Sequence, residues 1–283
     1  MKLGDLPIGA LVRDAVFEGA FLVAAQNHPT YPGATTLFSQ KVIGVRCLDA
    51  AEPEKPSRPA FEWEARFGSN DYAASNLHRW LNADQAAWFE PAHKYDRPPS
   101  AGFLRYGEQP YDDTPGFLAS LSGATRKRLV ESAVPVVRRG GKDRGELATV
   151  QAKVFLPSRT ELGKGDESGM AEGAPLPLLY DARIYKTAPL ASELKKHGRS
   201  WNPGRETAPD DAPQIYDPKY GWWYWMRTPS CKYSFLTRVA SPYGAVGYTY
   251  ANNDVVGVRP LMNLDADTEV EGDGKIEETF IIL

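Results

Sequence analysis

The sequence contains few of the residues that build metal and thiol sites. Its 283 residues include two cysteines, Cys47 and Cys231, and four histidines, none of which is spaced as H-x-x-H or HExxH. Two distant thiols do not make a disulfide framework, and scattered histidines do not predict a zinc centre. We interpret the cysteines as two buried free thiols. The alternative is a catalytic or bridged pair.

The chain also lacks a basic excess and a long apolar run. Its formal net charge is −3, which does not favour binding to nucleic acid or to an anionic membrane. No stretch approaches the roughly 18 apolar residues of a membrane-spanning helix, so we expect no membrane insertion. Asp5 and Pro7 interrupt the N-terminal segment. We therefore identify no secretory signal and expect synthesis in the cytoplasm.

Familiar catalytic motifs are missing as well. There is no G-x-S-x-G nucleophile elbow, and Gly163-Lys164-Gly165 lacks the flanking spacing of a phosphate-binding loop. Carboxylates are plentiful, but no spacing singles out a pair for sugar hydrolysis. We predict no cofactor. Calcium stays open as an alternative, because Asn252-Asn253-Asp254 and Asp265 with Asp267 offer oxygen ligands, although Asn and Asp also favour turns.

The chain is instead rich in glycine and proline, with 25 Gly and 23 Pro, which predicts many turns and irregular connections. Ser75 is a candidate helix N-cap before Leu77, Trp80 and Leu81, and Ser158 with Glu161 matches a capping box. We expect a second helix over Thr125–Ser132 and short strands over Glu18–Ala25, Thr35–Leu48, Pro135–Val137, Gln151–Leu156, Tyr224–Arg227, Ser234–Val239, Val246–Tyr250, Gly257–Met262 and, at a sheet edge, Phe280–Leu283.

These elements predict one α+β domain over residues 1–283, with loop insertions. Aromatic residues concentrate towards its C-terminal end. In a strand, Trp223 and Trp225 would share one face, with Trp222 and Tyr224 on the other. Several exposed tryptophans are rare in a soluble chain, so we expect most of this cluster in the core.

The segment Tyr233–Asp254 has a different composition, dominated by Tyr, Ser, Gly and Asn. This mixture is typical of binding loops, where Tyr gives rigid contact area and Ser and Asn give adaptable hydrogen bonds. The alternative is a Tyr-rich antiparallel sheet with one solvated face. The candidate ligand-binding residues are Tyr233, Phe235, Tyr243, Tyr248, Tyr250, Asn252 and Asn253.

Two motifs carry a family resemblance: WWYWMRTP over Trp222–Pro229 and GVRPLMNL over Gly257–Leu264. They resemble the WWLRSP…GVRPALNL signature of an uncharacterised family of bacterial and phage-encoded domains, common in gut bacteria. The stretches Ser75–Asn82 and Val154–Gly163 are similar too, so the resemblance covers most of the chain. As a family mark it is fairly specific, but it implies no established activity.

This family is distantly similar to the C-type-lectin-like fold, which also serves formylglycine-generating enzymes and phage receptor-binding tips. The resemblance implies short antiparallel strands, two or more helices and long irregular loops. It also implies that the residues between the motifs form an exposed ligand face, and that Arg227 and Arg259 pair with carboxylates or carbonyls. The expected framework residues are Trp222, Trp223, Trp225, Arg227 and Arg259.

The resemblance implies a non-enzymatic, phage- or prophage-encoded protein that recognises a cell-surface glycan or protein. Tips of this kind are virion-associated and often trimeric, so a homo-oligomer is an expectation. One alternative is an enzyme on the formylglycine-generating fold, which would need Cys47 beside Cys231 to hold copper. Another is a structural particle protein without a ligand of its own.

Overall fold

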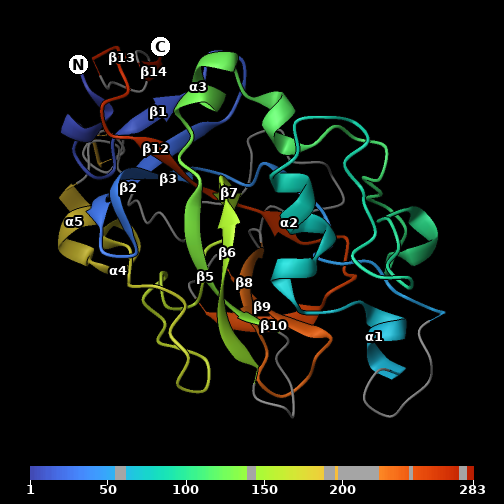
Figure 1. Cartoon of the computed structure of the whole chain (residues 1–283). Helices are drawn as coiled ribbons and strands as arrows, with labels where there is room; N and C mark the ends of the chain where they lie inside the picture. The colour runs from blue at the N-terminus through green and yellow to red at the C-terminus, as the bar shows by residue number, and fades with distance from the viewer. Residues whose placement is uncertain (55–61, 139–144, 188–194, 197–222, 242–244, 274–278) are drawn as a thin grey trace.

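The computed structural model describes the chain apart from residues 55–61, 139–144, 188–194, 197–222, 242–244 and 274–278 (Figure 1). Helices and strands are mixed, which confirms the α+β class. The described helices are α1 (Glu62–Phe67), α2 (Asn76–Leu81), α3 (Gly123–Arg128), α4 (Pro177–Tyr180) and α5 (Ala182–Thr187), with short 3₁₀ turns at Leu3–Asp5, Tyr72–Ala74, Ala101–Phe103 and Phe117–Ser120.

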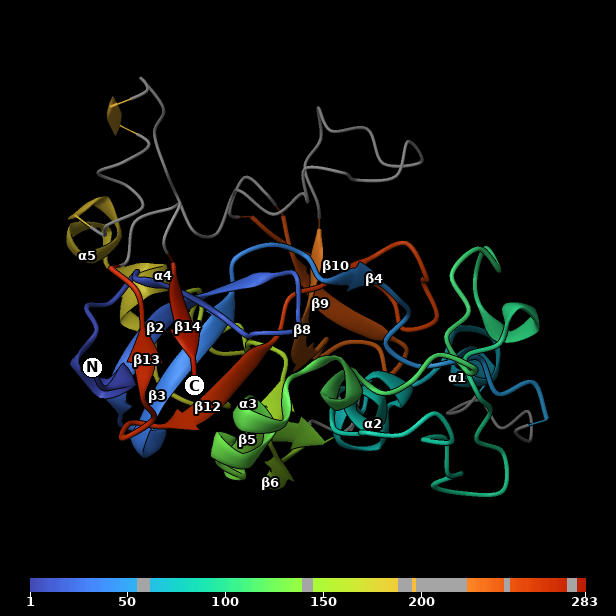
Figure 2. The same ribbon diagram turned by 90° about the horizontal axis from the view of Figure 1, so that it is seen from above.

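The largest sheet has the strand order β13-β14-β1-β2-β3-β12-β7. Its members are β1 (Leu11–Arg13), β2 (Ala20–His28), β3 (Tyr31–Ser39), β7 (Val154–Phe155), β12 (Leu261–Asp265), β13 (Val270–Glu271) and β14 (Phe280–Ile282). The first residues lie beside the last ones, because β1 pairs in parallel with β14. Both termini therefore lie on the side of the molecule that this sheet occupies (Figure 2).

The second sheet has the order β10-β9-β8-β11-β4. It comprises β4 (Gly44–Val45), β8 (Tyr224–Pro229), β9 (Leu236–Ala240), β10 (Val246–Tyr250) and β11 (Gly257–Val258), and a separate hairpin joins β5 (Ser132–Arg138) to β6 (Glu146–Ala152). One buried apolar cluster runs from Leu3 to Ile282 and includes residues of both large sheets. Between them, the rings of Phe38 and Tyr224 lie 6.3 Å apart.

The strand expected over Gly257–Met262 is wrong in one respect, because it is divided between the two sheets as β11 and β12. The division falls at Arg259-Pro260. Proline has no N–H to donate to a ladder, and here its carbonyl accepts from Ser39 N at 2.9 Å. The Arg259 guanidinium donates to the Ser39 and Gln40 carbonyls and lies 4.1 Å from the Phe38 ring. The corner thus fastens one sheet to the other.

Predictions that depend on residues a few positions apart in the sequence are confirmed. The Ser75 side chain accepts from His78 N, as an N-cap should, and Leu77, Trp80 and Leu81 are buried. Ser158 and Glu161 form the reciprocal capping box, with Ser158 N bound to the Glu161 carboxylate at 2.9 Å and Glu161 N bound to Ser158 Oγ at 3.1 Å. The predicted strand Val246–Tyr250 coincides with β10.

Two other expectations need correction, and one helix was not predicted. The helix expected over Thr125–Ser132 ends at Arg128, because Leu129 bridges to Leu264 and Val130 N donates to the Asn263 carbonyl. The C-terminal strand lies between β13 and β1 and not at a sheet edge. Helix α1 was missed. Among the described helices, none is long and apolar enough to span a membrane.

Candidate ligand-binding face

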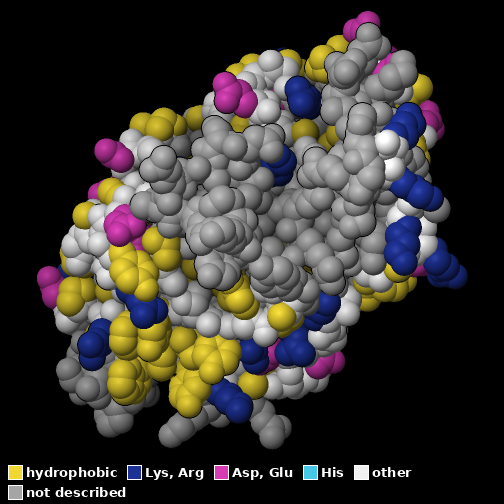
Figure 3. Space-filling view, turned by 180° about the vertical axis from the view of Figure 1, so that it is seen from behind, with side chains coloured by type: hydrophobic (Ala, Val, Ile, Leu, Met, Phe, Trp, Pro, Cys, Tyr) yellow, Lys and Arg dark blue, Asp and Glu magenta, His cyan; other side chains and the backbone are white. Residues whose placement is uncertain are grey.

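Seven aromatic side chains gather around α1 and the ends of β9 and β10. We call this set the aromatic face; it consists of Trp63, Phe67, Tyr106, Tyr233, Phe235, Tyr248 and Tyr250. Figure 3 shows hydrophobic side chains concentrated on the side of the molecule that carries α1, with Lys and Arg side chains beside them.

The rings at the centre of the face are nearly parallel. Phe67 stacks on Tyr250 with centroids 4.1 Å apart and planes at 16°, and Trp63 lies 5.9 Å from Phe67 at 7°. Phe235 stacks on both Trp63 and Tyr250, at 5.5 Å and 5.9 Å, and Tyr233 lies 5.5 Å from Phe235. Offset stacking of this kind contributes about 0.5–1.5 kcal/mol per pair beyond the area buried.

The backbone explains why these rings meet. Trp63 and Phe67 are four residues apart in α1, so they lie on one helix face. Gly68 ends the helix with a φ of +76° and donates its N–H to the Glu64 carbonyl. The Phe67 carbonyl then accepts from Asn252 N at 2.9 Å, which ties α1 to the chain just after β10.

Four members of the face are unusually exposed for large aromatic residues. The exposed fractions are 49% for Trp63, 53% for Tyr106, 50% for Tyr233 and 60% for Tyr248. Tyr248 and Tyr250 are two residues apart in β10, so both project from the same face of the sheet. Exposed apolar patches on soluble proteins often mark binding sites.

Two arginines stack on the face. The Arg105 guanidinium carbon lies 4.5 Å from the Tyr250 ring centroid and 5.2 Å from that of Tyr106, and the Arg66 carbon lies 5.1 Å from the Phe67 ring. Both arginines are exposed. Neither guanidinium has a carboxylate partner within the described part of the chain.

Arg238 differs from these two, because it is committed to an ion pair. Its guanidinium lies 5.7 Å from the Tyr248 ring and binds both oxygens of Glu167, at 3.0 Å and 2.6 Å. Burial would raise the pKa of Glu167, but hydrogen bonds from Arg238 and Cys231 outweigh burial and lower it to about 2. Arg238 therefore fixes one border of the face.

The residues proposed from sequence divide into three groups. Tyr233, Phe235, Tyr248 and Tyr250 belong to the aromatic face. The expectation that Asn252 and Asn253 are exposed is wrong, because both are buried. Asn252 Nδ2 donates to the Arg66 carbonyl and Asn253 Nδ2 donates to Thr249 Oγ1. Tyr243 and Trp222 lie outside the described residues.

Sequence reasoning missed the members that lie far from the Tyr-rich segment. Trp63, Phe67, Arg105 and Tyr106 precede it by more than a hundred residues. A signal did exist for α1: two aromatic residues at i and i+4 in a six-residue helical stretch. No local pattern connects Arg105 to β10, because the contact is purely tertiary.

Two of the carboxylates considered for calcium already have protein partners. The Asp254 carboxylate accepts from the backbone N–H groups of Tyr106, Glu108 and Gln109. The Asp267 carboxylate pairs with Lys2 at 2.6 Å. Among the described residues there is no group of three or more His, Cys, Asp or Glu side chains that could hold a metal ion. Asp254 instead fixes the loop that carries Arg105 and Tyr106.

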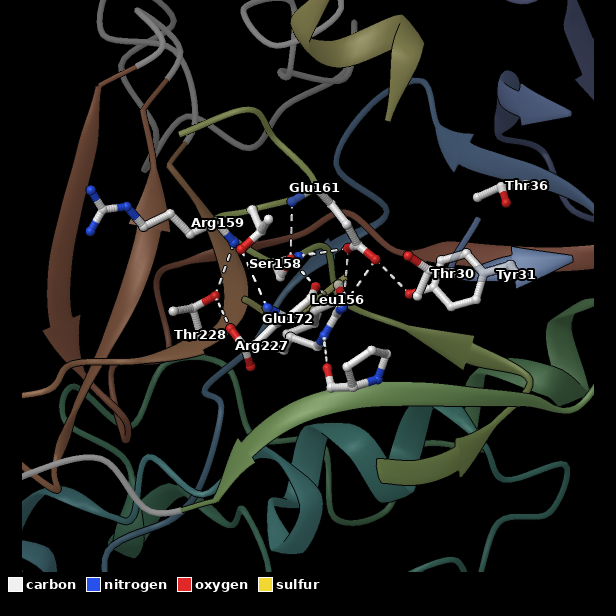
Figure 4. Close-up of polar contacts among 12 residues, drawn as sticks. Thr30, Tyr31, Thr36, Leu156, Ser158, Arg159, Glu161, Glu172, Arg227 and Thr228 are labelled. Carbon is white, nitrogen blue, oxygen red and sulfur yellow. Dashed lines mark hydrogen bonds and ion pairs between the residues drawn. The ribbon is translucent and has the colours of Figure 1, made fainter. Parts of the chain in front are cut away.

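Arg227, which is not a member of the aromatic face, lies in a buried polar cluster (Figure 4). Its guanidinium binds both oxygens of Glu161, at 2.6 Å and 3.0 Å, and donates to the carbonyls of Pro135, Leu156 and Glu172. Tyr31 donates to the same Glu161 carboxylate at 2.5 Å. Arg227 and Glu161 have no exposed surface, so the cluster joins β3, β5, β8 and the Ser158–Glu172 loop and has no access for a substrate.

The pKa values of Arg227 and Tyr31 are shifted by burial and by the charge of Glu161. Burial would lower the pKa of Arg227, but Glu161 outweighs it and raises that pKa. Burial and the Glu161 charge raise the pKa of Tyr31 well above its usual range. The guanidinium therefore stays charged, and the phenol keeps the proton that it donates.

The tryptophan motif is only partly core. Trp225 is fully buried and donates Nε1–H to the Arg46 carbonyl at 2.8 Å. Trp223 belongs to the cluster that we expected mostly in the core, but its side chain is 42% exposed. Its ring covers Gly247, where an added Cβ would lie 2.8 Å from the indole. Gly247 has no side chain that could cover the Trp223 ring, so this ring stays at the surface.

The cysteines are both free thiols. Cys47 is buried, its sulfur lies 3.8 Å from the Tyr111 hydroxyl, and burial raises its pKa well above the usual range. Cys231 is partly exposed, and its N–H donates to Glu167 at 3.2 Å. The two thiols thus contact different residues, and the bridged pair considered from sequence is not formed.

Comparison with known proteins places the chain in a family. No curated protein and no solved structure matches it. A family model described as "Domain of unknown function (DUF6273)" matches residues 34–266. This range contains α1, the loop with Arg105 and all of β8 to β12, and thus every member of the aromatic face. Because the match covers more than four fifths of the sequence, the chain belongs to the DUF6273 family.

Proposed function

We propose that this chain is a non-enzymatic ligand-binding protein whose aromatic face recognises a cell-surface glycan or protein. The observation that carries the proposal is the stack of Trp63, Phe67, Phe235 and Tyr250, with Tyr106, Tyr233 and Tyr248 exposed around it. Trp, Tyr and Arg are the residues that most often dominate binding energy at interfaces.

The packing of the rings supports binding by a rigid surface. Phe67 and Tyr250 are held between α1 and β10, so these rings lose little further side-chain entropy when a ligand arrives. The exposed rings beside them offer apolar area that water covers unfavourably. Tyrosine adds a hydroxyl at its outer edge, so the same ring can stack and hydrogen-bond.

The relationship of this fold to other folds is part of the same proposal. We infer a distant C-type-lectin-like relationship from the paired motifs at Trp222–Pro229 and Gly257–Leu264. On this reading the chain is a phage- or prophage-encoded receptor-binding protein, carried on a particle and assembled as a homo-oligomer. The motifs contribute β8, β11 and β12, and the aromatic residues between them include four members of the face.

A binding screen tests the proposal. The labelled protein is applied to a glycan array and to a panel of bacterial cells, next to Trp63→Ala and Tyr233→Ala. The matched control is Tyr180→Ala, because Tyr180 is 54% exposed but lies in α4, away from the aromatic face. We expect the two face variants to lose at least tenfold in affinity, as interface hot spots do.

Stability has to be measured in parallel. All three positions are about half exposed. Tyr233→Ala and Tyr180→Ala should stay within about 1 kcal/mol of the parent in free energy of unfolding. Trp63→Ala also removes the stacks on Phe67 and Phe235, so it should cost about 1–3 kcal/mol. The proposal fails if the face variants bind as well as the control does, or if the loss of binding follows unfolding.

A further inference from the structure

The position of Arg105 narrows the ligand class, given that the aromatic face is the binding site as proposed above. Its guanidinium stacks on Tyr250 and Tyr106 at 4.5 Å and 5.2 Å. The backbone on either side is fixed, since Arg105 N donates to the Asn252 carbonyl and Tyr106 N donates to Asp254, at 2.9 Å and 3.0 Å. Arg105 is therefore preorganised, although its side chain is exposed.

Stacking leaves the edge of a guanidinium free. The five N–H donors of arginine lie in the plane of the group, so a ring above that plane does not use them. Among the described residues no acceptor for the Arg105 side chain is found, and Glu108 on the same loop forms no ion pair with it. Planar, unpaired donors of this kind match the paired oxygens of a carboxylate or phosphate.

Neighbouring charges point the same way. Arg66 stacks on Phe67 and has no carboxylate partner among the side chains that the structure describes, and Lys232 is an exposed cation beside Tyr233. Glu64, the acid of α1 whose side chain is described, is buried. Arg66, Arg105 and Lys232 thus outnumber Glu108, an exposed acid on the loop that carries Arg105, which favours an anionic ligand.

The size of the face limits the ligand further. An aromatic residue has about 150–250 Å² of surface to bury, so four half-exposed rings offer on the order of 400 Å². A stable protein partner usually buries about 800 Å² per side. The aromatic face is thus about half the size that a folded partner or a second copy of the chain would need, and suits a short chain molecule.

We propose that this molecule is an acidic glycan. A sugar ring has a flat face of C–H groups and a border of hydroxyls, which complements flat aromatic rings with Tyr hydroxyls at their outer edge. Its acidic group would bind the unpaired edge of Arg105. A peptide with apolar side chains would instead favour recesses between the rings, and the stacking of Trp63, Phe67, Phe235 and Tyr250 fills the centre of the face.

Matched pairs of probes test the inference by isothermal titration calorimetry. The pairs are trigalacturonate with its methyl ester, 3′-sialyllactose with lactose, and mannose 6-phosphate with mannose. The first two pairs carry a carboxylate and the third a phosphate, so they distinguish the source of the negative charge. We expect at least one acidic probe to bind tenfold or more tightly than its neutral partner, with affinity falling as salt rises.

Two variants assign that preference to Arg105. Arg105→Gln should remove the preference, so that the acidic probe and its neutral partner bind this variant with affinities within about twofold of each other. Arg105→Lys keeps the charge but loses the planar fork, so it should restore only part of the preference. Arg183→Gln is the control, since that arginine is exposed in α5 and paired with Asp181.

The outcomes separate this inference from the proposed function. If the neutral probes bind as tightly as the acidic ones, or if Arg105→Gln keeps the preference, the acidic-glycan inference is wrong and the ligand-binding proposal stands. If no sugar binds but an acidic peptide does, the ligand is a protein segment and the inference is again wrong. If the array and the cell panel are also negative, the proposed function itself fails.

Discussion

At the scale of single residues, Arg227 is a buried charge whose donors all have acceptors. Arg227 has four carbonyl and carboxylate partners in a site with no exposed surface. A buried ion pair adds little net stability compared with an apolar pair of the same shape, but removing one partner leaves the other charged in a dry site.

Replacing Arg227 with methionine should therefore destabilise the fold by about 3–5 kcal/mol. Unfolding in urea measures this loss in the free energy of unfolding. Arg227→Lys, which keeps the charge without the fork, should lose less. Arg138→Met is the control: Arg138 pairs with Asp71 at 2.9 Å near the surface, where such a pair contributes less than about 1 kcal/mol. Equal losses at both sites would contradict the account.

His78 gives the fold a dependence on acid. Burial lowers its pKa from 6.5 to about 4, and the charge of Arg79 adds to the effect. The unfolded chain takes up this proton below pH 6.5 and the folded chain does so only near pH 4. The free energy that the neutral His78 contributes to folding is therefore fully present above pH 6.5. It decreases as the pH falls from 6.5 to 4, with a slope of up to about 1.4 kcal/mol per pH unit.

His78→Gln removes this proton from both states. Urea unfolding at pH 7.0, 5.5 and 4.5 should show a smaller fall in stability for the variant than for the parent. Acidic groups shared by both proteins cancel in this comparison. Parallel stability curves for the two proteins would show that His78 does not titrate as described.

At the scale of elements, the sequence predicts what short-range chemistry determines. The N-cap at Ser75, the capping box of Ser158 and Glu161, and β10 all depend on residues a few positions apart. The division of the Gly257–Met262 segment could not be predicted in this way, because it depends on where Ser39 and Phe38 lie in another strand. Helix α1 was missed because its six residues form fewer than two turns.

Gly68 is the element-scale test of the aromatic face. It ends α1 with a φ of +76°, and an added Cβ would lie 2.4 Å from the Asp49 carbonyl oxygen. Gly68→Ala should cost more than about 2 kcal/mol, since the left-handed backbone alone costs about 1 kcal/mol and the clash adds to it. The stack of Trp63 and Phe67 should loosen, which near-ultraviolet circular dichroism detects.

Gly33→Ala is the matched control. Gly33 has the same φ of +76°, but nothing lies within 4 Å of its added Cβ. Gly33→Ala should lower the free energy of unfolding only by the cost of a left-handed backbone, about 1 kcal/mol. It should leave the near-ultraviolet circular dichroism spectrum unchanged. If both alanine variants behave alike, the close approach of Gly68 to Asp49 does not position α1.

At the scale of the whole molecule, the candidate site joins three distant parts of the chain: α1, the loop with Arg105 and Tyr106, and β9 with β10. Composition alone identified the third part, where Tyr233, Phe235, Tyr248 and Tyr250 cluster in sequence. Asn252 and Asn253 shared that composition but serve the turn after β10. Composition cannot separate a residue that faces a ligand from one that holds a loop.

The most direct test of the central claim is the binding of one identified ligand by three proteins: the parent, Tyr233→Ala and Tyr180→Ala. Both tyrosines are about half exposed, and only Tyr233 belongs to the aromatic face. The account predicts that Tyr233→Ala weakens binding at least tenfold with unchanged unfolding, while Tyr180→Ala binds like the parent. Equal affinity of all three proteins would contradict the assignment of the aromatic face as the binding site.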